Sequence, residues 1–488
     1  MPAGGKFPLC RCDRSGAVWY TAIMKPNILF INVDQLRFDS VGANGNRLVK
    51  TPNIDAIAEK GISFSRAYTP LPSCCPARQT LLSGMMPEQH GGFWNYDGGG
   101  ALPAAGLSPE APVWVRQLRD AGYRTAYIGK WHVHPELDPT HYGFETADDA
   151  PNDPFHTPFR KEKYLIDNPW PEFPVGWCET QPVEDCHTHQ LARKCVEKIE
   201  EFEAAGGAPW HIRLDYFEPH LPCIPAEPFA SMVPPETIPP WGNFEESFDG
   251  KPYIQKQQVR NWCLENWTWD EWSVYLSGYY GMISQMDDSL GQLFQCLEKH
   301  DLLKNTLIIF TTDHGDAAGS HRLMDKHYVM YEEETHVPLF IRWDGVIEPG
   351  SVCSDFVSHF LDLPVTLLEL LNLPVPESYQ GQSLLPMLNG APNPNPREFA
   401  FSTYNGQQFG LFCQRMIRDG KYKYVWNATD VDELYDLEAD PFEMSNLAAQ
   451  DEDSERCLEY RKKLYEVFES LNDPVVTGMW NRRRLLSQ

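Results

Sequence analysis

Short apolar runs alternate with amphipathic stretches along the first part of the chain. Residues 27–33, NILFINV, form a continuous apolar run, which is typical of a strand buried on both faces of a parallel sheet. Similar runs at 125–128, 212–216 and 306–310 each follow a segment with apolar residues at helical spacing. These predicted helices cover 113–121, 187–202 and a stretch in which Tyr279, Met282, Ile283, Met286, Leu290, Leu293 and Leu297 share one face. The alternation predicts an α/β fold, a doubly wound sheet with helices on both faces.

The pattern changes after the linker-like segment 391–396, APNPNP. Strand-like runs at 399–403, 409–415 and 423–426, followed by an amphipathic stretch at 456–471, predict a smaller C-terminal α+β subdomain with an antiparallel sheet. We therefore predict a disordered extension at 1–23, a catalytic domain at 24–392 and a C-terminal subdomain at 393–488. Residues 135–180 and 220–262 are rich in Pro, Trp, Asp and Phe, and we expect them to form long surface loops.

Composition narrows the function classes without naming one. The 488 residues suit one large domain plus a smaller one. A net charge of −27 argues against a nucleic-acid partner, because phosphate binding needs clustered Lys and Arg. The sequence has no apolar run long enough to span a membrane, and its first residues lack the apolar segment of a signal peptide. With 13 cysteines, an odd number, at irregular spacing, we expect reduced, mostly buried thiols and a cytoplasmic protein.

Chemically versatile residues follow each predicted strand. In open α/β sheets, ligands bind at the carboxyl ends of the strands. The residues that follow the four predicted strands are Asp34 and Gln35, then Lys130 and His132 in GKWH, then His220 in EPHLP, and finally Asp313 and His314. Each alone could be a strand-end cap or a core hydrogen-bonding group. Together they favour a site, in which a divalent cation would relieve the repulsion between Asp34 and Asp313.

The segment SCCPARQTLLSG, residues 73–84, predicts a helix that presents a cysteine. Pro76 suits the first turn of a helix, so Cys74 would lie at the N-terminus, where the helix dipole favours anions and activates nucleophiles. Arg78, one turn further on, would point back to the same end. Taken by itself, the pattern allows a reactive thiolate, a redox cysteine or an inert buried one.

The same segment resembles the signature of the sulfatase family. The motif C-x-P-x-R followed by a Leu-x-Ser/Thr-Gly run places Cys74, Pro76, Arg78, Leu81, Leu82 and Gly84 in register. The resemblance continues in NILFINVDQLRFD, GKWH, PHLP, TTDHGD with Lys326 thirteen residues after Asp313, and ELYDLEADPFEMSNLA at 433–448. It spans about residues 25–450. It implies an alkaline phosphatase-like large mixed sheet with helices on both faces, plus the C-terminal subdomain.

The resemblance also implies a nucleophile and a cofactor. In the family, a maturase converts the first cysteine of the motif to formylglycine, so Cys74 would supply the attacking hydroxyl after hydration. One divalent cation would be held by Asp34, Asp313 and His314, with Gln35 and residue 74 as further ligands. Ca²⁺ is the expected ion, with Mn²⁺ or Mg²⁺ as alternatives.

The remaining roles carry over in the same way. Arg78 and Lys130 would orient the formylglycine, and His132 would take the proton from its second hydroxyl. Lys326 would bind a sulfate oxygen, and His220 would lie near the bridging oxygen and protonate the leaving group.

Two positions depart from the common sulfatase pattern. Gln35 and His314 stand where many members have Asp and Asn, a variant that resembles the choline sulfatase and phosphonate monoester hydrolase branches. Asn95 also fits the latter branch, whereas Lys130 and His132 do not. The departure leaves open which metal is bound and whether Gln35 ligates it.

We expect Asn95, Trp94 and Trp131 to contact the substrate, the two indoles by stacking on an aryl or sugar leaving group. Ordinary core packing is the alternative for each tryptophan. The predicted reaction is the hydrolysis of a sulfate monoester (aryl, small-molecule or saccharide) without a nucleic-acid or membrane partner. The alternatives are a phosphonate monoester or phosphodiester hydrolase with the same nucleophile, a cysteine hydrolase, and a non-catalytic binding protein on this scaffold.

Overall fold

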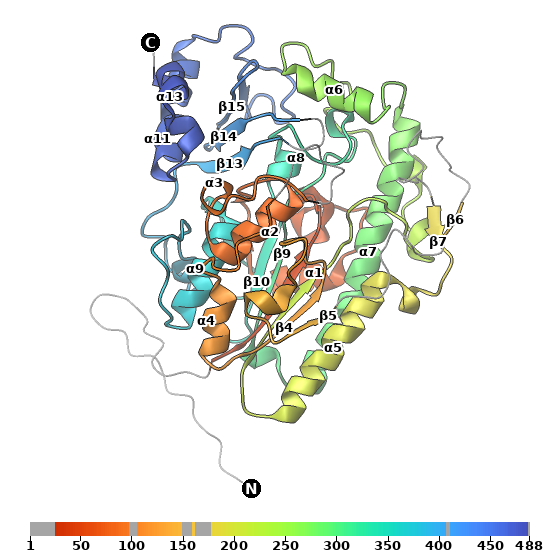
Figure 1. Cartoon of the computed structure of the whole chain (residues 1–488). Coiled ribbons are helices and arrows are strands. Elements are labelled where there is room, and N and C mark those ends of the chain that lie inside the picture. Colours follow the sequence, from red (N-terminus) through yellow and green to blue (C-terminus); the bar gives the residue numbers. More distant parts are fainter. Residues whose placement is uncertain (1–24, 97–104, 149–158, 162–176, 407–409, 487–488) are drawn as a thin grey trace.

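The four apolar runs predicted as strands lie side by side at the centre of an eight-stranded mixed sheet (Figure 1). The computed structural model describes residues 25–96, 105–148, 159–161, 177–406 and 410–486. The strand order is β11-β2-β10-β9-β1-β8-β4-β5. Its members are β1 Asn27–Val33, β2 Ile62–Phe64, β4 Arg124–Gly129, β5 Thr146–Asp148, β8 Trp210–Asp215, β9 Thr306–Thr312, β10 Leu339–Arg342 and β11 Ser351–Cys353. Strands β9, β1, β8 and β4 are mutually parallel, whereas β10 is antiparallel to both its neighbours.

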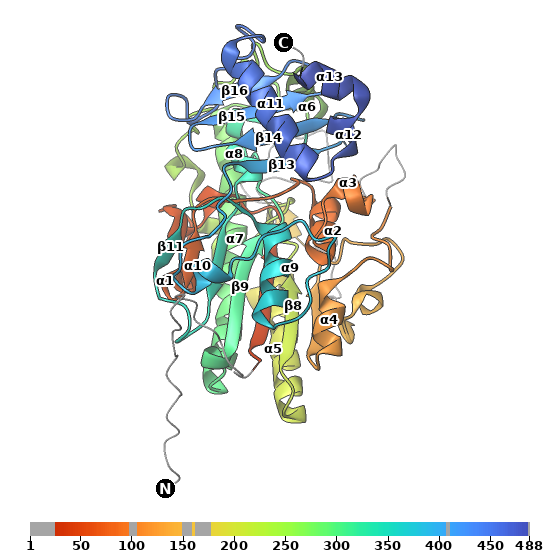
Figure 2. The ribbon, with the colours of Figure 1, turned by 90° about the vertical axis from the view of Figure 1, so that its left-hand side faces the viewer.

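Helices cover both faces of this sheet, as predicted (Figures 1 and 2). One layer is α1 Pro52–Glu59, α5 His187–Ala205 and α7 Trp269–Lys299, and the other is α2 Cys74–Ser83, α4 Trp114–Asp120 and α9 His359–Leu370. Successive side chains of β1 point to opposite faces, so Leu29 and Ile31 join the core under the first layer and Ile28 and Phe30 join the core under the second. A strand buried on both sides explains the continuous apolar run at 27–33.

Helix α7 is longer than its apolar repeat predicted. It begins at Trp269, where Thr268 and Glu271 form a capping box, and this arrangement satisfies two backbone groups at the helix start. The short elements outside the main sheet and its two layers are β3 Ala67–Tyr68, β6 Phe159–Lys161, β7 Trp177–Glu179, β12 Val357–Ser358, α3 Pro87–His90, α6 Tyr253–Asn261, α8 Glu332–Thr335, α10 Leu385–Leu388, α12 Pro474–Thr477 and α13 Met479–Leu486.

The prediction of a long surface loop at 220–262 was correct for the irregular backbone of residues 220–252 and wrong for the rest and for its position at the surface. Residues 253–261 form α6, and Leu221 and Trp262 are buried members of the core beneath α7. The prolines and aromatic residues that suggested a loop provide packing here. The loop predicted at 135–180 lies partly outside the described residues, and its described part contributes the edge strand β5.

A four-stranded antiparallel sheet forms the C-terminal part, as predicted (Figures 1 and 2). Its strands run in sequence order: β13 Ala400–Tyr404, β14 Gln414–Arg418, β15 Tyr422–Asn427 and β16 Glu433–Asp436. Helix α11, Glu455–Ser470, packs on one face. On the other face, Tyr404 and Met416 share a buried apolar cluster with Tyr68 and Tyr328. Strand β14 starts later than predicted, because the register with β13 and β15 begins at Gln414.

The remaining predictions concern the domain boundaries, the state of the cysteines and membrane-spanning helices. The boundary between 392 and 393 remains a prediction, and the extension at 1–23 lies outside the described residues. None of the cysteines in the described ranges forms a disulfide, and most are buried. Within those ranges, no helix has the length and apolar character that crossing a membrane requires.

Candidate active site

Four adjacent parallel strands deliver charged residues to the same edge of the sheet. Strands β9, β1, β8 and β4 are neighbours in this order. Asp313 directly follows β9, Asp34 follows β1 and Lys130 follows β4, while β8 ends at Asp215. The backbone N–H of Lys130 donates to the Asp215 carbonyl at 2.9 Å. This close approach requires Gly129, because a Cβ there would lie 2.0 Å from that carbonyl oxygen. The structure thus brings Asp34, Lys130 and Asp313 to one edge, as the strand-end rule predicts, and adds Asp215.

Helix α2 presents Cys74 to this edge. The helix begins at Cys74, and both the cysteine and Arg78 are fully buried. The Asn95 side-chain oxygen accepts from the Cys75 N–H at 2.9 Å and from the Ser73 hydroxyl at 3.1 Å. Asn95 thus stabilises the start of the helix by accepting from a backbone N–H that has no partner within the helix. Its contact with substrate remains a prediction.

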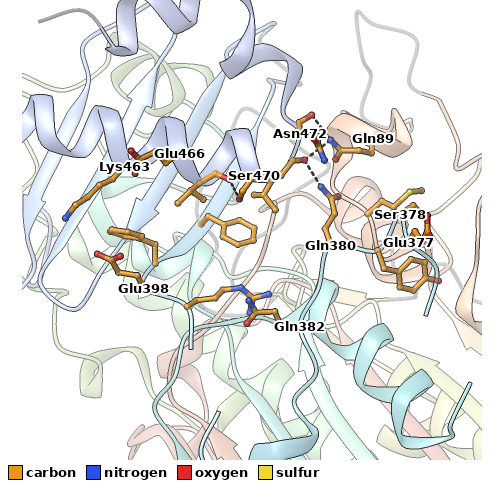
Figure 3. Close-up of a pocket in the computed structure, with 17 residues that line it drawn as sticks. Gln89, Glu377, Ser378, Gln380, Gln382, Glu398, Lys463, Glu466, Ser470 and Asn472 are labelled. Atoms are coloured by element: carbon orange, nitrogen blue, oxygen red, sulfur yellow. Dashed lines mark hydrogen bonds between the residues drawn. The ribbon is translucent and has the colours of Figure 1, made fainter. Parts of the chain in front are cut away.

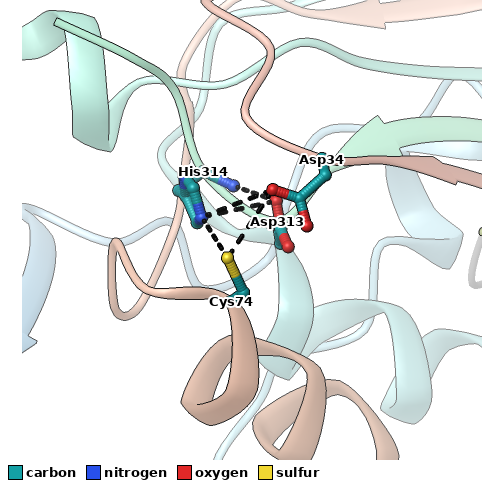
Figure 4. A group of neighbouring side chains, drawn as sticks. All are labelled: Asp34, Cys74, Asp313 and His314. Carbon is teal, nitrogen blue, oxygen red and sulfur yellow. Dashed lines mark hydrogen bonds and ion pairs between the residues drawn. The ribbon is translucent and has the colours of Figure 1, made fainter. Parts of the chain in front are cut away.

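Four side chains converge where α2 meets the strand ends (Figure 4). Asp34, Cys74, Asp313 and His314 each offer an atom within 4.8 Å of the others. The Cys74 sulfur lies 3.2 Å from His314 Nε2 and 3.6 Å from Asp34 Oδ1. His314 Nε2 also lies 3.7 Å from Asp313 Oδ1. We call these residues the four-residue cluster.

The histidine of the cluster has the tautomer that a metal ligand needs. His314 Nδ1 lies 2.8 Å from the Gly315 carbonyl oxygen. A carbonyl oxygen can only accept, so Nδ1 carries the proton and Nε2 presents its lone pair to the cluster. Burial lowers the pKa of His314, and the charge of Asp313 only partly offsets this effect. The imidazole is therefore neutral, and the set of two carboxylate oxygens, one imidazole nitrogen and residue 74 fits a divalent cation.

Arg78 binds both carboxylates of the four-residue cluster through their Oδ2 atoms. Its guanidinium lies 2.8 Å from Asp34 Oδ2, 2.9 Å from Asp313 Oδ2 and 2.7 Å from Asp215 Oδ2. Lys130 Nζ is also 2.8 Å from Asp34 Oδ2. Burial opposes ionisation of Asp34, but Lys130 and Arg78 together hold its pKa well below the usual value. Each carboxylate thus binds Arg78 through Oδ2 and directs Oδ1 toward Cys74 and His314.

A second pair of cationic and imidazole groups lies beside the cluster. Lys326 Nζ donates to His220 Nε2 at 2.8 Å, while His220 Nδ1 lies 2.6 Å from the Leu221 carbonyl oxygen. His220 is therefore protonated on Nδ1 only. Burial, followed by the charges of Lys326 and Lys130, lowers its pKa well below the usual value. In the hydrogen bond between the two side chains, Lys326 Nζ therefore carries the proton and His220 Nε2 accepts it.

Gln35 joins Lys326 to two further acids. Its side-chain oxygen accepts from Lys326 Nζ at 2.7 Å, and its amide nitrogen donates to Asp316 at 2.7 Å and Asp325 at 3.0 Å. The described contacts of Gln35 thus tie it to Lys326, and ligation of a cation by Gln35 remains a prediction. Gln35, His132 and Asp325 all have left-handed backbone, with φ of 65°, 50° and 68°. Such strained conformations cluster at functional sites in many proteins.

The two tryptophans proposed as substrate contacts have well-defined partners elsewhere in the protein. Trp131 donates its indole N–H to the Leu137 carbonyl at 2.8 Å and packs on Tyr127 and Tyr142, as a core residue does. Trp94 is part-buried and donates to the Asn405 carbonyl at 3.2 Å, directly after β13. His132 is buried, and its ring lies edge-on to Tyr96. Substrate contact by either tryptophan remains a prediction.

Sequence reasoning missed three acids of the site. Asp215 binds Arg78 and, in two hydrogen bonds of 2.7 Å, Arg213. Asp316 and Asp325 hold the Gln35 amide. Asp215 could have been found, because it stands at the end of a predicted strand. Asp316 and Asp325 follow no strand directly, and only their spatial approach to Gln35 identifies them.

A separate cavity of about 880 Å³ lies between α11 and the loop around 377–382 (Figure 3). Tyr379, Gln380, Phe401 and Lys463 are among the residues that line it. It borders Met85, beyond the far end of α2 from Cys74, and contains none of the predicted site residues. The cavity is therefore distinct from the site described above.

The sequence model described as Sulfatase matches residues 26–373, which is most of the chain. The chain belongs to the sulfatase family. A second model, described as N-sulphoglucosamine sulphohydrolase, C-terminal, matches residues 319–470. As a family member, this sulfatase is a sulfuric ester hydrolase.

Individual relatives are similar over nearly their whole length. An arylsulfatase of Clostridium perfringens is 29% identical over 93% of this chain and 97% of its own. A choline-sulfatase of Rhizobium meliloti is 31% identical, covering 87% of this chain and 82% of its own. The crystal structure of a phosphonate monoester hydrolase of Agrobacterium radiobacter superimposes with a TM-score of 0.76 at 26% identity, covering 91% of this chain and 96% of that one.

Proposed function

We propose that this sulfatase hydrolyses a sulfate monoester to an alcohol and inorganic sulfate through a formylglycine made from Cys74 by a maturase. One observation carries the proposal. Cys74 lies buried at the N-terminus of α2, 3.2 Å from His314 Nε2 and next to two carboxylates that Arg78 holds in place. A hydroxyl at this position would face a set of ligands suited to a cation. It would also lie at the positive end of the helix dipole, which stabilises negative charge on its oxygen.

Asp34, Asp313, His314 and residue 74 would hold the cation. When bound, the cation would lower the pKa of a hydroxyl on residue 74 and offset the negative charge of the sulfate group. The oxygen-rich donor set favours Ca²⁺, with Mn²⁺ or Mg²⁺ as alternatives because one ligand is an imidazole.

The chain's own groups account for the two halves of the reaction. In the first half, a hydroxyl of hydrated residue 74 would give up its proton and attack sulfur, the S–O bond of the ester would break, and the alcohol oxygen would leave with one proton, so that no net proton is gained or lost. Lys326 would supply positive charge at the sulfate, and His220 beside it would protonate the leaving oxygen from its Nε2 after taking up a second proton. In the second half, the other hydroxyl of residue 74 gives its proton to His132, the bond to sulfate breaks, and the aldehyde is restored.

An aryl, a small-molecule or a saccharide sulfate ester all fit the proposed chemistry, and a cytoplasmic location, also a proposal, would favour a small ester. A second candidate, hydrolysis of a phosphonate monoester or phosphodiester with the same nucleophile, is favoured by the Gln35 and His314 variant and by the similarity to the Agrobacterium enzyme. Comparing kcat/KM on matched aryl sulfate and aryl phosphonate esters separates the two.

The decisive experiment is the mass of the peptide that contains Cys74, from protein produced together with the maturase. Conversion replaces the thiol sulfur by oxygen and removes two hydrogens. We expect the converted mass in active protein and Cys74→Ala to be inactive. Cys75→Ala is the matched control, since the neighbouring thiol is buried on the same helix, and we expect it to be converted normally. Full activity with an unmodified Cys74 would refute the proposal and favour a cysteine hydrolase.

A further inference from the structure

A second group of metal-binding side chains lies far from the catalytic edge, where α5 and α7 end together. The two helices run parallel: His189 pairs with Asp288 near one end of the contact, and Glu200 pairs with Lys299 eleven residues further along both helices. Figure 1 shows them side by side on one face of the sheet. At this shared end, Glu200, Cys296 and His300 each offer a ligand atom within 4.8 Å of the others.

We propose that Glu200, Cys296 and His300 form a Zn²⁺ site that links α5 to α7. Cys296 and His300 are four residues apart, so on a helical backbone both point to the same side. Glu200 approaches from the neighbouring helix, and His300 Nε2 lies 3.3 Å from Glu200 Oε1. A thiolate, an imidazole and a carboxylate are the three kinds of protein ligand that Zn²⁺ takes, and a water would complete the tetrahedron.

The local environment supports a cation at this point. His300 is the residue at which α7 ends, and the C-terminus of a long helix carries partial negative charge from its unpaired carbonyl groups. Cys296 is almost completely buried, so its sulfur is shielded from bulk solvent, while His300 is exposed and gives the ion a path of entry.

One existing contact competes with the metal. Lys299 Nζ binds the same Glu200 oxygen at 2.9 Å. The Lys299 side chain is 68% exposed, so it can turn into solvent at little cost when an ion takes its place. A carboxylate has a second oxygen as well, so Glu200 can keep Lys299 on one oxygen and bind the ion with the other.

The test uses the full chain carrying Cys74→Ala, which removes the only thiol of the four-residue cluster. This protein is titrated with Co²⁺ and Zn²⁺ alone. We expect a cobalt–thiolate charge-transfer absorption in the Cys74→Ala protein, and its loss when Cys296→Ser is added. His300→Ala, an exposed substitution that preserves the core, should weaken Zn²⁺ binding, measured as displacement of this Co²⁺–thiolate absorption, by at least about tenfold.

The controls are Cys263→Ser and His141→Ala, an exposed thiol and an exposed imidazole elsewhere on the surface, and both should leave the absorption and the affinity unchanged. Zn²⁺ should also raise Tm while the three ligands are intact, and His300→Ala should abolish that part of the shift. The proposal is overturned if the Cys74→Ala protein shows no thiolate absorption, if Cys296→Ser leaves that absorption unchanged, or if Zn²⁺ displaces it from His300→Ala as readily as from the parent.

Discussion

Asp215 acts on the catalytic cluster through Arg78, which binds both Asp34 and Asp313. None of the described contacts of Asp215 is with Cys74 or His314. It accepts hydrogen bonds from Arg78, Arg213 and the Tyr127 hydroxyl at 2.7–2.8 Å. Both arginines are fully buried. We predict that Asp215→Asn, which preserves shape but removes the charge, lowers both stability and turnover.

The magnitude follows from the loss of an anion between two buried guanidinium groups. Removing one partner of a buried ion pair costs about 3–5 kcal/mol, because the remaining charge is left uncompensated. Unfolding entropy scales with length and is about 1 kcal/mol/K for a chain of this size, so Tm should fall by about 3–5 °C. Arg78 would also lose the contact that holds it against Asp34 and Asp313, and loss of such supporting contacts typically costs about 10- to 100-fold in metal affinity or activity.

The assay compares Asp215→Asn with Asp362→Asn, a carboxylate of equal burial that binds Arg397 through two hydrogen bonds of 2.6 Å in another part of the fold. Tm, bound metal and kcat are measured for each, with kcat taken well below the lower Tm and per converted residue 74. Both variants should lose stability, and only Asp215→Asn should lose turnover and metal affinity. If folded Asp215→Asn keeps wild-type kcat and metal content, Arg78 does not need Asp215 and the reasoning fails.

Two further predictions concern the cation and the response to acid. Dialysis against a chelator should abolish turnover by converted protein, and adding back Ca²⁺, Mn²⁺ or Mg²⁺ one at a time should identify the ion; activity that survives removal of all bound metal would contradict the proposed cofactor. Burial opposes ionisation of Glu246, but hydrogen bonds from His321 and Lys251 lower its pKa to about 2. A lowered folded pKa stabilises the protein above the unfolded pKa of about 4.5, by about 3 kcal/mol, and this stabilisation is lost as pH falls toward 2. The Tm difference between wild type and Glu246→Gln should therefore be largest above pH 5 and shrink in acid, and a difference independent of pH would contradict the assignment.

The sequence predicted the centre of the fold well because burial on both faces leaves a strong signal. The runs at 27–33 and 306–310 are apolar at nearly every position, and the structure places them side by side as β1 and β9. Elements with a weaker pattern were missed. Strand β2 has only three residues and α6 follows a stretch rich in Pro, so their formation depends on tertiary partners rather than on local periodicity.

The candidate site was predictable where a rule connects sequence to position. The strand-end rule places Asp34, Lys130 and Asp313 at one edge, and the helix start at Cys74 follows from Pro76. The rule does not say which carboxylate oxygen faces the cluster. That depends on Arg78, whose contacts span 44 to 235 residues of sequence separation, and no local pattern encodes such distances.

The variant residue at position 35 is explained by its neighbours. Gln35 donates its amide nitrogen to Asp316 and Asp325 and accepts from Lys326 through its oxygen. An aspartate there would be shorter, would have no proton to donate, and would add a third negative charge next to two buried acids. Burial and the charge of Asp325 already raise the pKa of Asp316 to about 6, and a further carboxylate would raise it more. Gln35 and the acid pair thus form one unit, in which Asp325 rather than residue 35 balances Lys326, at 3.2 Å. The departure from the common family pattern at this position therefore preserves the charge balance around Lys326.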